Sequence, residues 1–113
     1  GAAVANFALQ FVGNPYKYGG TSLTDGADCS GFVQSVYAQF GISLPRTVGP
    51  QSNCGKGVSY SEAQPGDLIC YSGHIAIYIG GGNIVHAANS RSGIIVSTAK
   101  SFGAITTVRR IIE

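Results

Sequence analysis

The chain has 113 residues, enough for one domain with its own hydrophobic core but not for two. Charged residues make up 11% of the sequence, against about 25% in an average domain, and the scattered basic residues with a net charge of +2 argue against nucleic acid as a partner. Hydrophobic residues reach 44%, which excludes a disordered chain, and no apolar run approaches the ~20 residues of a membrane span.

The start of the sequence indicates a piece of a longer protein. There is no methionine anywhere, and residues 1–12 lack the basic segment that opens a signal peptide. We therefore expect residues 1–113 to form a single domain, with any targeting signal, anchor or partner domain outside it. Nothing in this weakly charged sequence indicates an obligate partner, so we expect a monomer.

Two amphipathic helices are expected in the first third of the chain. Residues 2–12 place apolar side chains on one face at helical spacing, and a glycine and a proline just beyond them end this helix. Residues 16–27 are rich in turn-forming residues and predict an irregular loop. Asp28 is then a suitable N-cap for a second helix over residues 29–40, with Gly41 as its C-cap.

Strands dominate the second half of the expected structure. A polar segment with room for one short helix at residues 47–52 precedes them, and a glycine-rich hairpin turn lies at residues 80–83. The expected strands are residues 67–71, 74–79, 84–88, 93–97 and 106–112. Helices first and antiparallel strands second predict an α+β fold, not a doubly wound parallel sheet.

Cys29 is the candidate nucleophile, because three cysteines leave at least one thiol unpaired. It lies in the expected first turn of the second helix, where backbone N–H groups and the helix dipole stabilise a thiolate and could hold an oxyanion. Asp28 works in the opposite direction, because a nearby carboxylate disfavours a second negative charge. The alternative is a buried cysteine that acts as a small hydrophobic residue.

His74 and His86 are the only histidines of the chain, and they fall on the two arms of the expected hairpin. Residues near the outer ends of such arms are cross-strand neighbours, so we expect the two imidazoles to lie close together. One could be the base for Cys29 and the other could orient that base. A zinc site formed by these three residues and another thiol is the alternative, but no CxxC or HxxxH pair presets two ligands.

Five other residues have two readings each. Tyr16 and Tyr18, in a glycine-rich loop, could line a cleft or pack at the surface, and Arg46 could bind a substrate carboxylate or remain a solvated charge. Cys54 and Cys70 could form a disulfide in a secreted protein or stay free thiols, and the sequence leaves both open.

Six segments of the chain, taken in order, resemble the NlpC/P60 family of cell-wall cysteine peptidases. The segments are residues 15–20, 28–33, 44–47, 65–69, 73–80 and 84–87. The resemblance covers nearly the whole chain. It implies a papain-like α+β fold, in which N-terminal helices pack on an antiparallel β-sheet and the nucleophile lies at a helix start.

The same resemblance implies a catalytic triad. Cys29 would be the nucleophile, His74 the general base and His86 the third, orienting member. The implied reaction is hydrolysis of the stem peptide of peptidoglycan between D-γ-glutamyl and the following diamino acid, diaminopimelate or lysine, through an acyl-enzyme. No metal or organic cofactor is expected.

Substrate contacts are also implied by the resemblance. Tyr18 would contact the region of the nucleophile, and Asp28 and Ser30 would bind the free amine of the substrate peptide. Arg46 matches a recurrent family position without a defined role. The implied location is extracellular, in the cell wall, with wall-binding or second catalytic domains outside this segment.

Three alternatives remain for the function. An amidase of the CHAP type or an acyltransferase on the same fold would share a helix-start cysteine and a strand histidine. A non-catalytic member would only bind wall peptides. His86, in place of Glu or Asn, favours the endopeptidase over the first two, and the competent residues at all three triad positions argue against the last.

Overall fold

A six-stranded antiparallel sheet and two helices longer than two turns make up the computed structural model, which describes residues 1–112. The first half of the chain contains α1 (Ala2–Leu9), β1 (Thr21–Ser22), β2 (Gly26–Ala27), α2 (Cys29–Ala38), α3 (Val48–Gln51) and β3 (Lys56–Val58). The second half contains the 3-10 helix η1 (Tyr60–Glu62), β4 (Leu68–Tyr71), β5 (His74–Gly80), β6 (Asn83–Asn89), β7 (Gly93–Thr98), α4 (Ala99–Phe102) and β8 (Ile105–Arg110).

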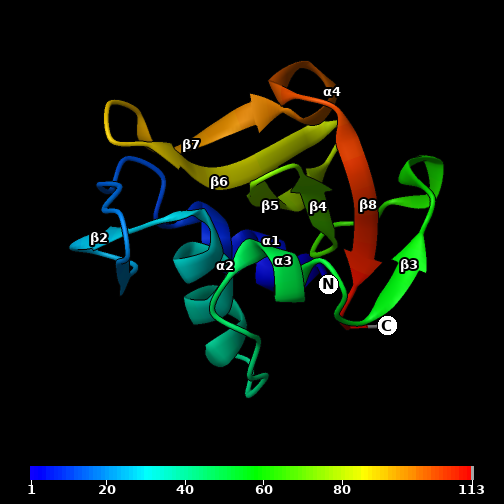
Figure 1. Ribbon diagram of the computed structural model, residues 1–113, viewed down its shortest axis with the longest axis horizontal. Coiled ribbons are helices and arrows are strands. Elements are labelled where there is room, and N and C mark those ends of the chain that lie inside the picture. Colours follow the sequence, from blue (N-terminus) through cyan, green and yellow to red (C-terminus); the bar gives the residue numbers. More distant parts are fainter. Residues whose placement is uncertain (113) are drawn as a thin grey trace.

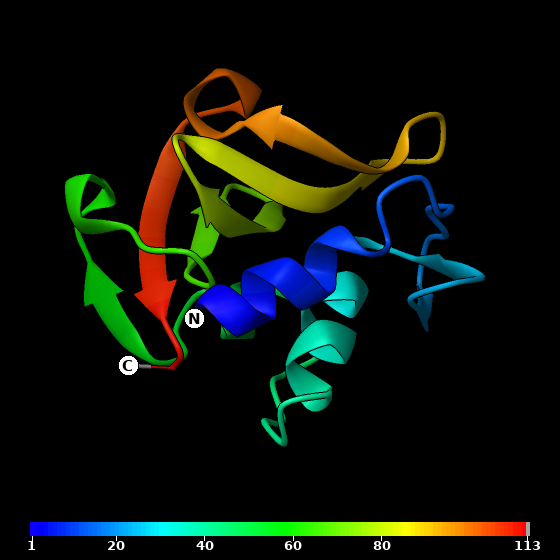
Figure 2. The same cartoon turned by 180° about the vertical axis from the view of Figure 1, so that it is seen from behind.

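The large sheet has the strand order β3-β8-β4-β5-β6-β7, and every neighbouring pair is antiparallel. Figures 1 and 2 show the sheet curving over α1 and α2, with β7 and α4 on the far side from these helices. No helix within residues 1–112 is both long and apolar enough to cross a membrane. The architecture is therefore the expected α+β fold, with N-terminal helices on an antiparallel sheet.

Both faces of the central strands are buried, which divides the core into two clusters. Along β5, Ile75 and Ile77 pack with Phe32 and Val33 of α2. The alternating residues of β5 belong to the second cluster, which also includes residues of β4, β6, α4 and β8. Because successive side chains of a strand point to opposite faces, this second cluster occupies the face away from α1 and α2.

A two-glycine turn joins β5 to β6. Gly81 and Gly82 have φ values of +63° and +82°, the combination that a type I′ turn requires and that glycine adopts without strain. The pairing register of β5 and β6 also shifts between Tyr78 and Gly80, just before this turn. The turn and the shift together set which residues of the two strands lie opposite each other, and so they align the two histidines.

The boundaries differ from the sequence expectation at several points. The first helix ends at Leu9, and residues 10–12 continue only as turns. The loop of residues 16–27 contains the two-residue strands β1 and β2, and neither β3 nor α4 was expected. β3 is short, contains a glycine and pairs only with the distant β8, so it leaves no local alternation in the sequence.

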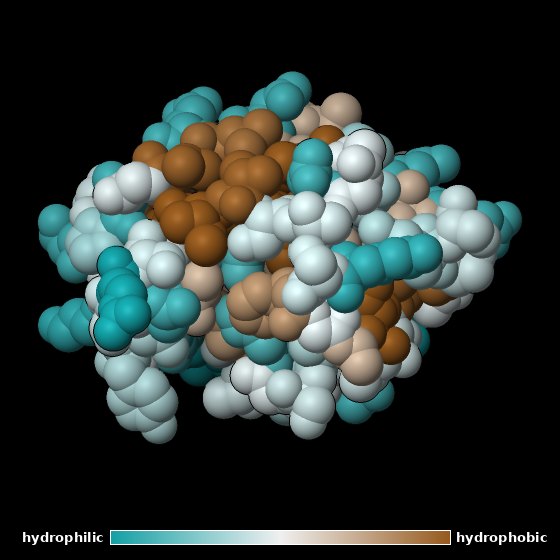
Figure 3. Space-filling model, turned by 90° about the horizontal axis from the view of Figure 1, so that it is seen from above, coloured by the Kyte–Doolittle hydropathy of each residue, from teal (hydrophilic) through white to brown (hydrophobic). Residues whose placement is uncertain are grey.

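Figure 3 shows the molecule from above, where one broad apolar patch lies among polar residues. Two large apolar side chains are exposed on the elements at the top of Figure 1, Val96 of β7 and Phe102 of α4. Phe102 also packs inward, with its ring centroid 5.2 Å from that of Tyr71.

Candidate active site

Cys29 is the first residue of α2, and the helix begins as the sequence predicts. Asp28 has extended backbone angles, and its Oδ1 accepts a 2.7 Å hydrogen bond from the Gly31 N–H, so it is the N-cap. The Cys29 thiol is half-buried against the core cluster below α2. The backbone N–H of Ile75 interacts with it, which places the sulfur beside the first residues of β5.

The pKa of the Cys29 thiol is raised in the substrate-free structure. Burial is the main cause, and the charge of Asp28 adds to it, while the N–H groups of Ile75, Ser30 and Cys29 itself act in the opposite direction. The expected stabilisation by the helix start is therefore present but outweighed. The structure favours a neutral thiol at rest, in place of the thiolate that the sequence position suggested.

His74 and His86 lie in contact, as the hairpin spacing predicts. His74 Nε2 lies 2.8 Å from His86 Nδ1, and the two rings are nearly perpendicular, at 80°. His74 is the first residue of β5 and is partly exposed, whereas His86 of β6 has no exposed surface. This bond occupies Nε2 of His74, so only its Nδ1 is left to exchange a proton with another group.

The hydrogen-bonded chain continues beyond the pair, because His86 Nε2 lies 2.8 Å from Ser97 Oγ on β7. An aromatic ring covers both histidines: the Phe102 centroid is 4.6 Å from His74 and 4.7 Å from His86. Tyr71 holds α4 in place, since its hydroxyl donates a 2.6 Å bond to the Ala99 carbonyl. Neither Ser97 nor Phe102 stood out in the sequence, because Ser97 lies within a strand of ordinary composition and Phe102 in the segment that follows it.

Burial lowers the pKa of both histidines to about 4, and the charge of His74 further disfavours protonation of His86. Both imidazoles are therefore neutral near pH 7, and His74 is available as a proton acceptor. From a neutral thiol and a neutral imidazole, one proton transfer would create the nucleophile.

Truncation of Phe102 should raise the pKa of both histidines. In the Phe102→Ala variant water replaces the ring, the burial that disfavours the imidazolium weakens, and the titration midpoints should rise from about 4 towards 6.5. NMR titration of the two imidazole C–H resonances measures this shift directly. Phe40→Ala removes a phenyl ring of similar exposure that packs on Phe7, and it should leave both midpoints unchanged. Unchanged midpoints in Phe102→Ala would show that this ring does not desolvate the pair.

Cys29 opens into a cleft of about 500 Å³. Its walls come from the loop before α2, the first turn of α2 and residues 46–48. Gly73, the residue before His74, also lines it. A larger groove of about 720 Å³ lies between η1 and β8, but neither Cys29 nor a histidine lines it. The chemistry therefore places the candidate site in the smaller cleft.

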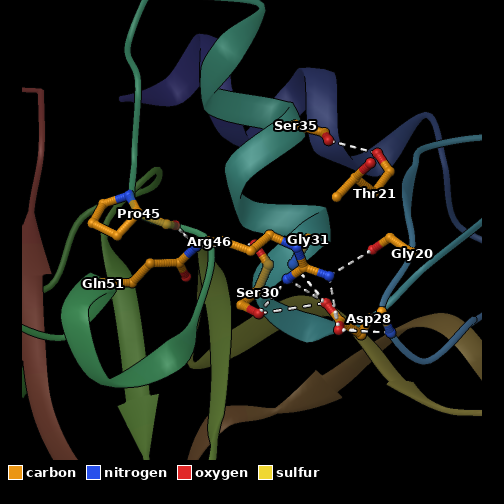
Figure 4. Close-up of polar contacts among 10 residues, drawn as sticks. Gly20, Thr21, Asp28, Ser30, Gly31, Ser35, Pro45, Arg46 and Gln51 are labelled. Carbon is orange, nitrogen blue, oxygen red and sulfur yellow. Dashed lines mark hydrogen bonds and ion pairs between the residues drawn. The ribbon is translucent and has the colours of Figure 1, made fainter.

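Arg46 holds Asp28 at one wall of this cleft, as Figure 4 shows. Its two terminal nitrogens donate to the two carboxylate oxygens of Asp28, each at 3.0 Å, and further bonds reach Ser30 Oγ and the Gly20 carbonyl. Although burial opposes this effect, the Arg46 and backbone hydrogen bonds leave the pKa of Asp28 below its usual value. Arg46 is thus an ion-pair partner of Asp28 and not a solvated surface charge, and a contact of Arg46 with substrate stays a prediction.

Both tyrosines of the loop before α2 line the cleft, but they differ in exposure. Tyr18 lines the cleft, but its side chain is 90% exposed. Tyr16, two residues earlier, also lines the cleft and interacts electrostatically with Cys29. Burial, followed by the nearby Cys29 and Asp28, raises the pKa of Tyr16. The two tyrosines look equivalent in the sequence, and only the course of the loop separates them.

Gln51 supports the nucleophile helix. It lies in a polar segment of the sequence, so nothing in the sequence indicated that it would be buried. It is fully buried, and its amide nitrogen donates to the carbonyls of Ser30 at 3.0 Å and Pro45 at 2.7 Å. Figure 4 shows this side chain beside the Arg46 network. It thereby joins the first turn of α2 to the segment that carries Arg46.

The three cysteines, Cys54 and Cys70 included, are all free thiols in the structure. Cys70 is buried in β4 and Cys54 is half-buried. Within residues 1–112, no three His, Cys, Asp or Glu side chains gather where they could jointly hold a metal ion.

A cysteine at a helix start next to β5, whose first residue His74 is bonded to His86, is an arrangement typical of papain-like thiol hydrolases. The profile of the NlpC/P60 family matches residues 13–111. The chain belongs to the NlpC/P60 family, as its motifs predicted.

Relatives and solved structures agree with this assignment. The peptidoglycan endopeptidase RipB of Mycobacterium tuberculosis is 37% identical over 90% of this chain and 49% of its own length. A γ-D-glutamyl-L-lysine dipeptidyl-peptidase of Bacillus cereus is 37% identical over 88% of this chain and 32% of its own. A crystal structure of an NlpC/P60 protein from Bacillus cereus superposes with a TM-score of 0.92, at 34% identity, over 100% of this chain and 41% of that one. The chain thus spans half or less of these proteins.

Proposed function

We propose that this domain is a cysteine endopeptidase that cleaves the stem peptide of peptidoglycan between D-γ-glutamyl and the diamino acid. The observation that carries the proposal is the placement of Cys29 at the start of α2 beside β5, whose first residue His74 is bonded to His86 at 2.8 Å. Two relatives support the substrate class, since one is named a peptidoglycan endopeptidase and the other a γ-D-glutamyl-L-lysine dipeptidyl-peptidase.

The proposed reaction begins with a proton transfer from the Cys29 thiol to Nδ1 of His74. The thiolate then attacks the carbonyl carbon of the γ-glutamyl bond, and backbone N–H groups at the start of α2 stabilise the negative oxygen. His74 returns the proton to the leaving amine as the C–N bond breaks, which leaves a thioester on Cys29. A water molecule deprotonated by His74 hydrolyses this acyl-enzyme and restores the thiol.

His86 fits the proposed role of orienting residue. Its Nδ1 can accept the N–H that His74 carries on Nε2, so the imidazole ring of His74 stays fixed through both proton transfers. The low pKa of His86 keeps this acceptor neutral when His74 becomes charged.

Asp28 and Ser30 line the cleft and remain the proposed contacts of the substrate's free amine. Arg46 already neutralises the Asp28 carboxylate and donates to Ser30. We therefore expect the amine to add less binding energy than it would gain from an unpaired carboxylate. Acetylation of the substrate amine should raise KM by about tenfold or less.

The experiment that tests the function is mass spectrometry of the products from defined tetrapeptides. The substrates are L-Ala-γ-D-Glu peptides with diaminopimelate or lysine in the third position, with their N-acetylated forms and an intact muropeptide. A cut after γ-D-Glu is expected, and the better substrate names the third residue. Release of the whole stem from the sugar would instead show an amidase. No product from any substrate, despite alkylation of Cys29 by iodoacetamide, would contradict the endopeptidase and leave a transferase or a binding module.

The biological setting follows from the same proposal. We expect the domain to act in the extracellular cell wall, as a monomer, and as one part of a longer protein with further domains that bind or cut the wall. This organisation is consistent with two relatives in which about half or more of the chain lies outside the matched region.

A further inference from the structure

The hydrogen-bonded chain of the site has a fourth member. Ser97 Oγ, on β7, lies 2.8 Å from His86 Nε2, while His86 Nδ1 faces His74 Nε2 at the same distance. Because His86 has no exposed surface, water does not reach its ring. Ser97 is therefore the partner on which the second nitrogen of His86 depends.

Protons can be arranged along this chain in two directions, since each neutral imidazole has one N–H and one lone pair. In the first, His74 Nε2–H donates to His86 Nδ1, and His86 Nε2–H donates to Ser97 Oγ. The lone pair of His74 is then on Nδ1, where it can take a proton. In the second, Ser97 donates to His86 and His86 donates to His74, so His74 carries its proton on Nδ1 and cannot act there as a base.

Only the first direction is compatible with a charged His74. An imidazolium carries hydrogen on both nitrogens, so its Nε2–H needs His86 Nδ1 as an acceptor. His86 must then keep its own hydrogen on Nε2, and Ser97 Oγ is the acceptor within reach. The half-buried Ser97 can still donate its hydroxyl hydrogen to water, so it loses nothing by accepting.

We propose that Ser97 is a positioning residue, which accepts a hydrogen bond from His86 and so holds His86 in the tautomer that receives the N–H of His74. The proposal rests on the proposed roles of Cys29 and His74. It extends the triad by a residue on a third strand, placed by the register that sets Ser97 opposite Ile84.

Two measurements on uniformly ¹⁵N-labelled protein test the role of Ser97. Long-range ¹H–¹⁵N correlation spectra distinguish a protonated from an unprotonated imidazole nitrogen, and in the unsubstituted protein Nδ1 of His86 should be unprotonated. Ser97→Ala should populate both tautomers, and stem-peptide hydrolysis should lose about tenfold to a hundredfold in kcat with KM within about twofold. Ser97→Thr keeps the hydroxyl and should restore both. Thr98→Ala removes an exposed hydroxyl on the neighbouring residue, which makes no side-chain capping bond to α4, and is the matched control.

The outcomes separate this inference from the proposed function. A hydrogen on Nδ1 of His86 in the unsubstituted protein, or an unchanged tautomer and kcat in Ser97→Ala, would overturn the role of Ser97 while hydrolysis by Cys29 stands. If no stem peptide is cleaved but Ser97→Ala still alters the tautomer of His86, the positioning role holds and the proposed reaction fails.

Discussion

Replacement of Cys29 by alanine is expected to lower the rate of stem-peptide hydrolysis by at least about a thousandfold, because no other group can form the thioester. The half-buried thiol is small, so the fold should persist. Product formation followed by mass spectrometry measures the loss, and circular dichroism with thermal unfolding verifies the structure.

Cys54 provides the matched control for this prediction. It is also a free, half-buried thiol, but it does not line the cleft. Cys54→Ala should retain hydrolysis within about twofold of the unsubstituted protein. Substantial turnover by Cys29→Ala would refute the covalent mechanism and, with it, the role proposed for His74 as the base of Cys29.

Replacement of Arg46 by alanine is expected to lower the free energy of unfolding by about 1–2 kcal/mol at pH 7. The variant loses the paired hydrogen bonds to Asp28 and leaves that carboxylate, only 15% exposed, without a counter-charge. The value lies at the lower end for charged hydrogen bonds because the Arg46 side chain is 33% exposed and partly screened by water. Urea denaturation followed by circular dichroism gives the difference.

The pH dependence identifies the cause of this loss. The pKa of Asp28 is lower in the folded protein than in the unfolded chain, so its contribution to stability is complete above about pH 4 and disappears as the pH falls through the folded-state pKa. The difference between the Arg46→Ala variant and the unsubstituted protein should therefore shrink at low pH. Arg46→Lys keeps the charge but not the two-pronged geometry and should recover part of the stability. An equal difference at pH 7 and pH 3 would attribute the effect to packing.

The Asp28–Arg46 pair also bears on the shape of the cleft. Arg46 precedes α3, Asp28 precedes α2, and Gln51 joins the same two segments through the Ser30 and Pro45 carbonyls. Two independent links thus hold the 45–51 segment against the first turn of the nucleophile helix. Residues 46–48 form one wall of the cleft, so these links fix the distance between that wall and Cys29.

Local patterns were sufficient for the parts of the site that lie within one element or one hairpin. Asp28 caps the helix that begins at Cys29 because a short side chain with an oxygen acceptor at that position can bond the N–H of the residue three places on. His74 and His86 meet because strand alternation and a glycine turn determine the register of a hairpin. In both cases the residues that decide the geometry are neighbours in the sequence.

The sequence by itself therefore determined the fold class, the capped helix that presents Cys29 and the histidine hairpin. The tertiary structure alone decided which groups surround them: Arg46 on Asp28, Tyr16 near Cys29, and Ser97 and Phe102 on the histidines. The physical reason is that these contacts join separate elements. Their geometry depends on the curvature and strand order of the whole sheet and on the course of the loops, which no periodicity in the sequence encodes.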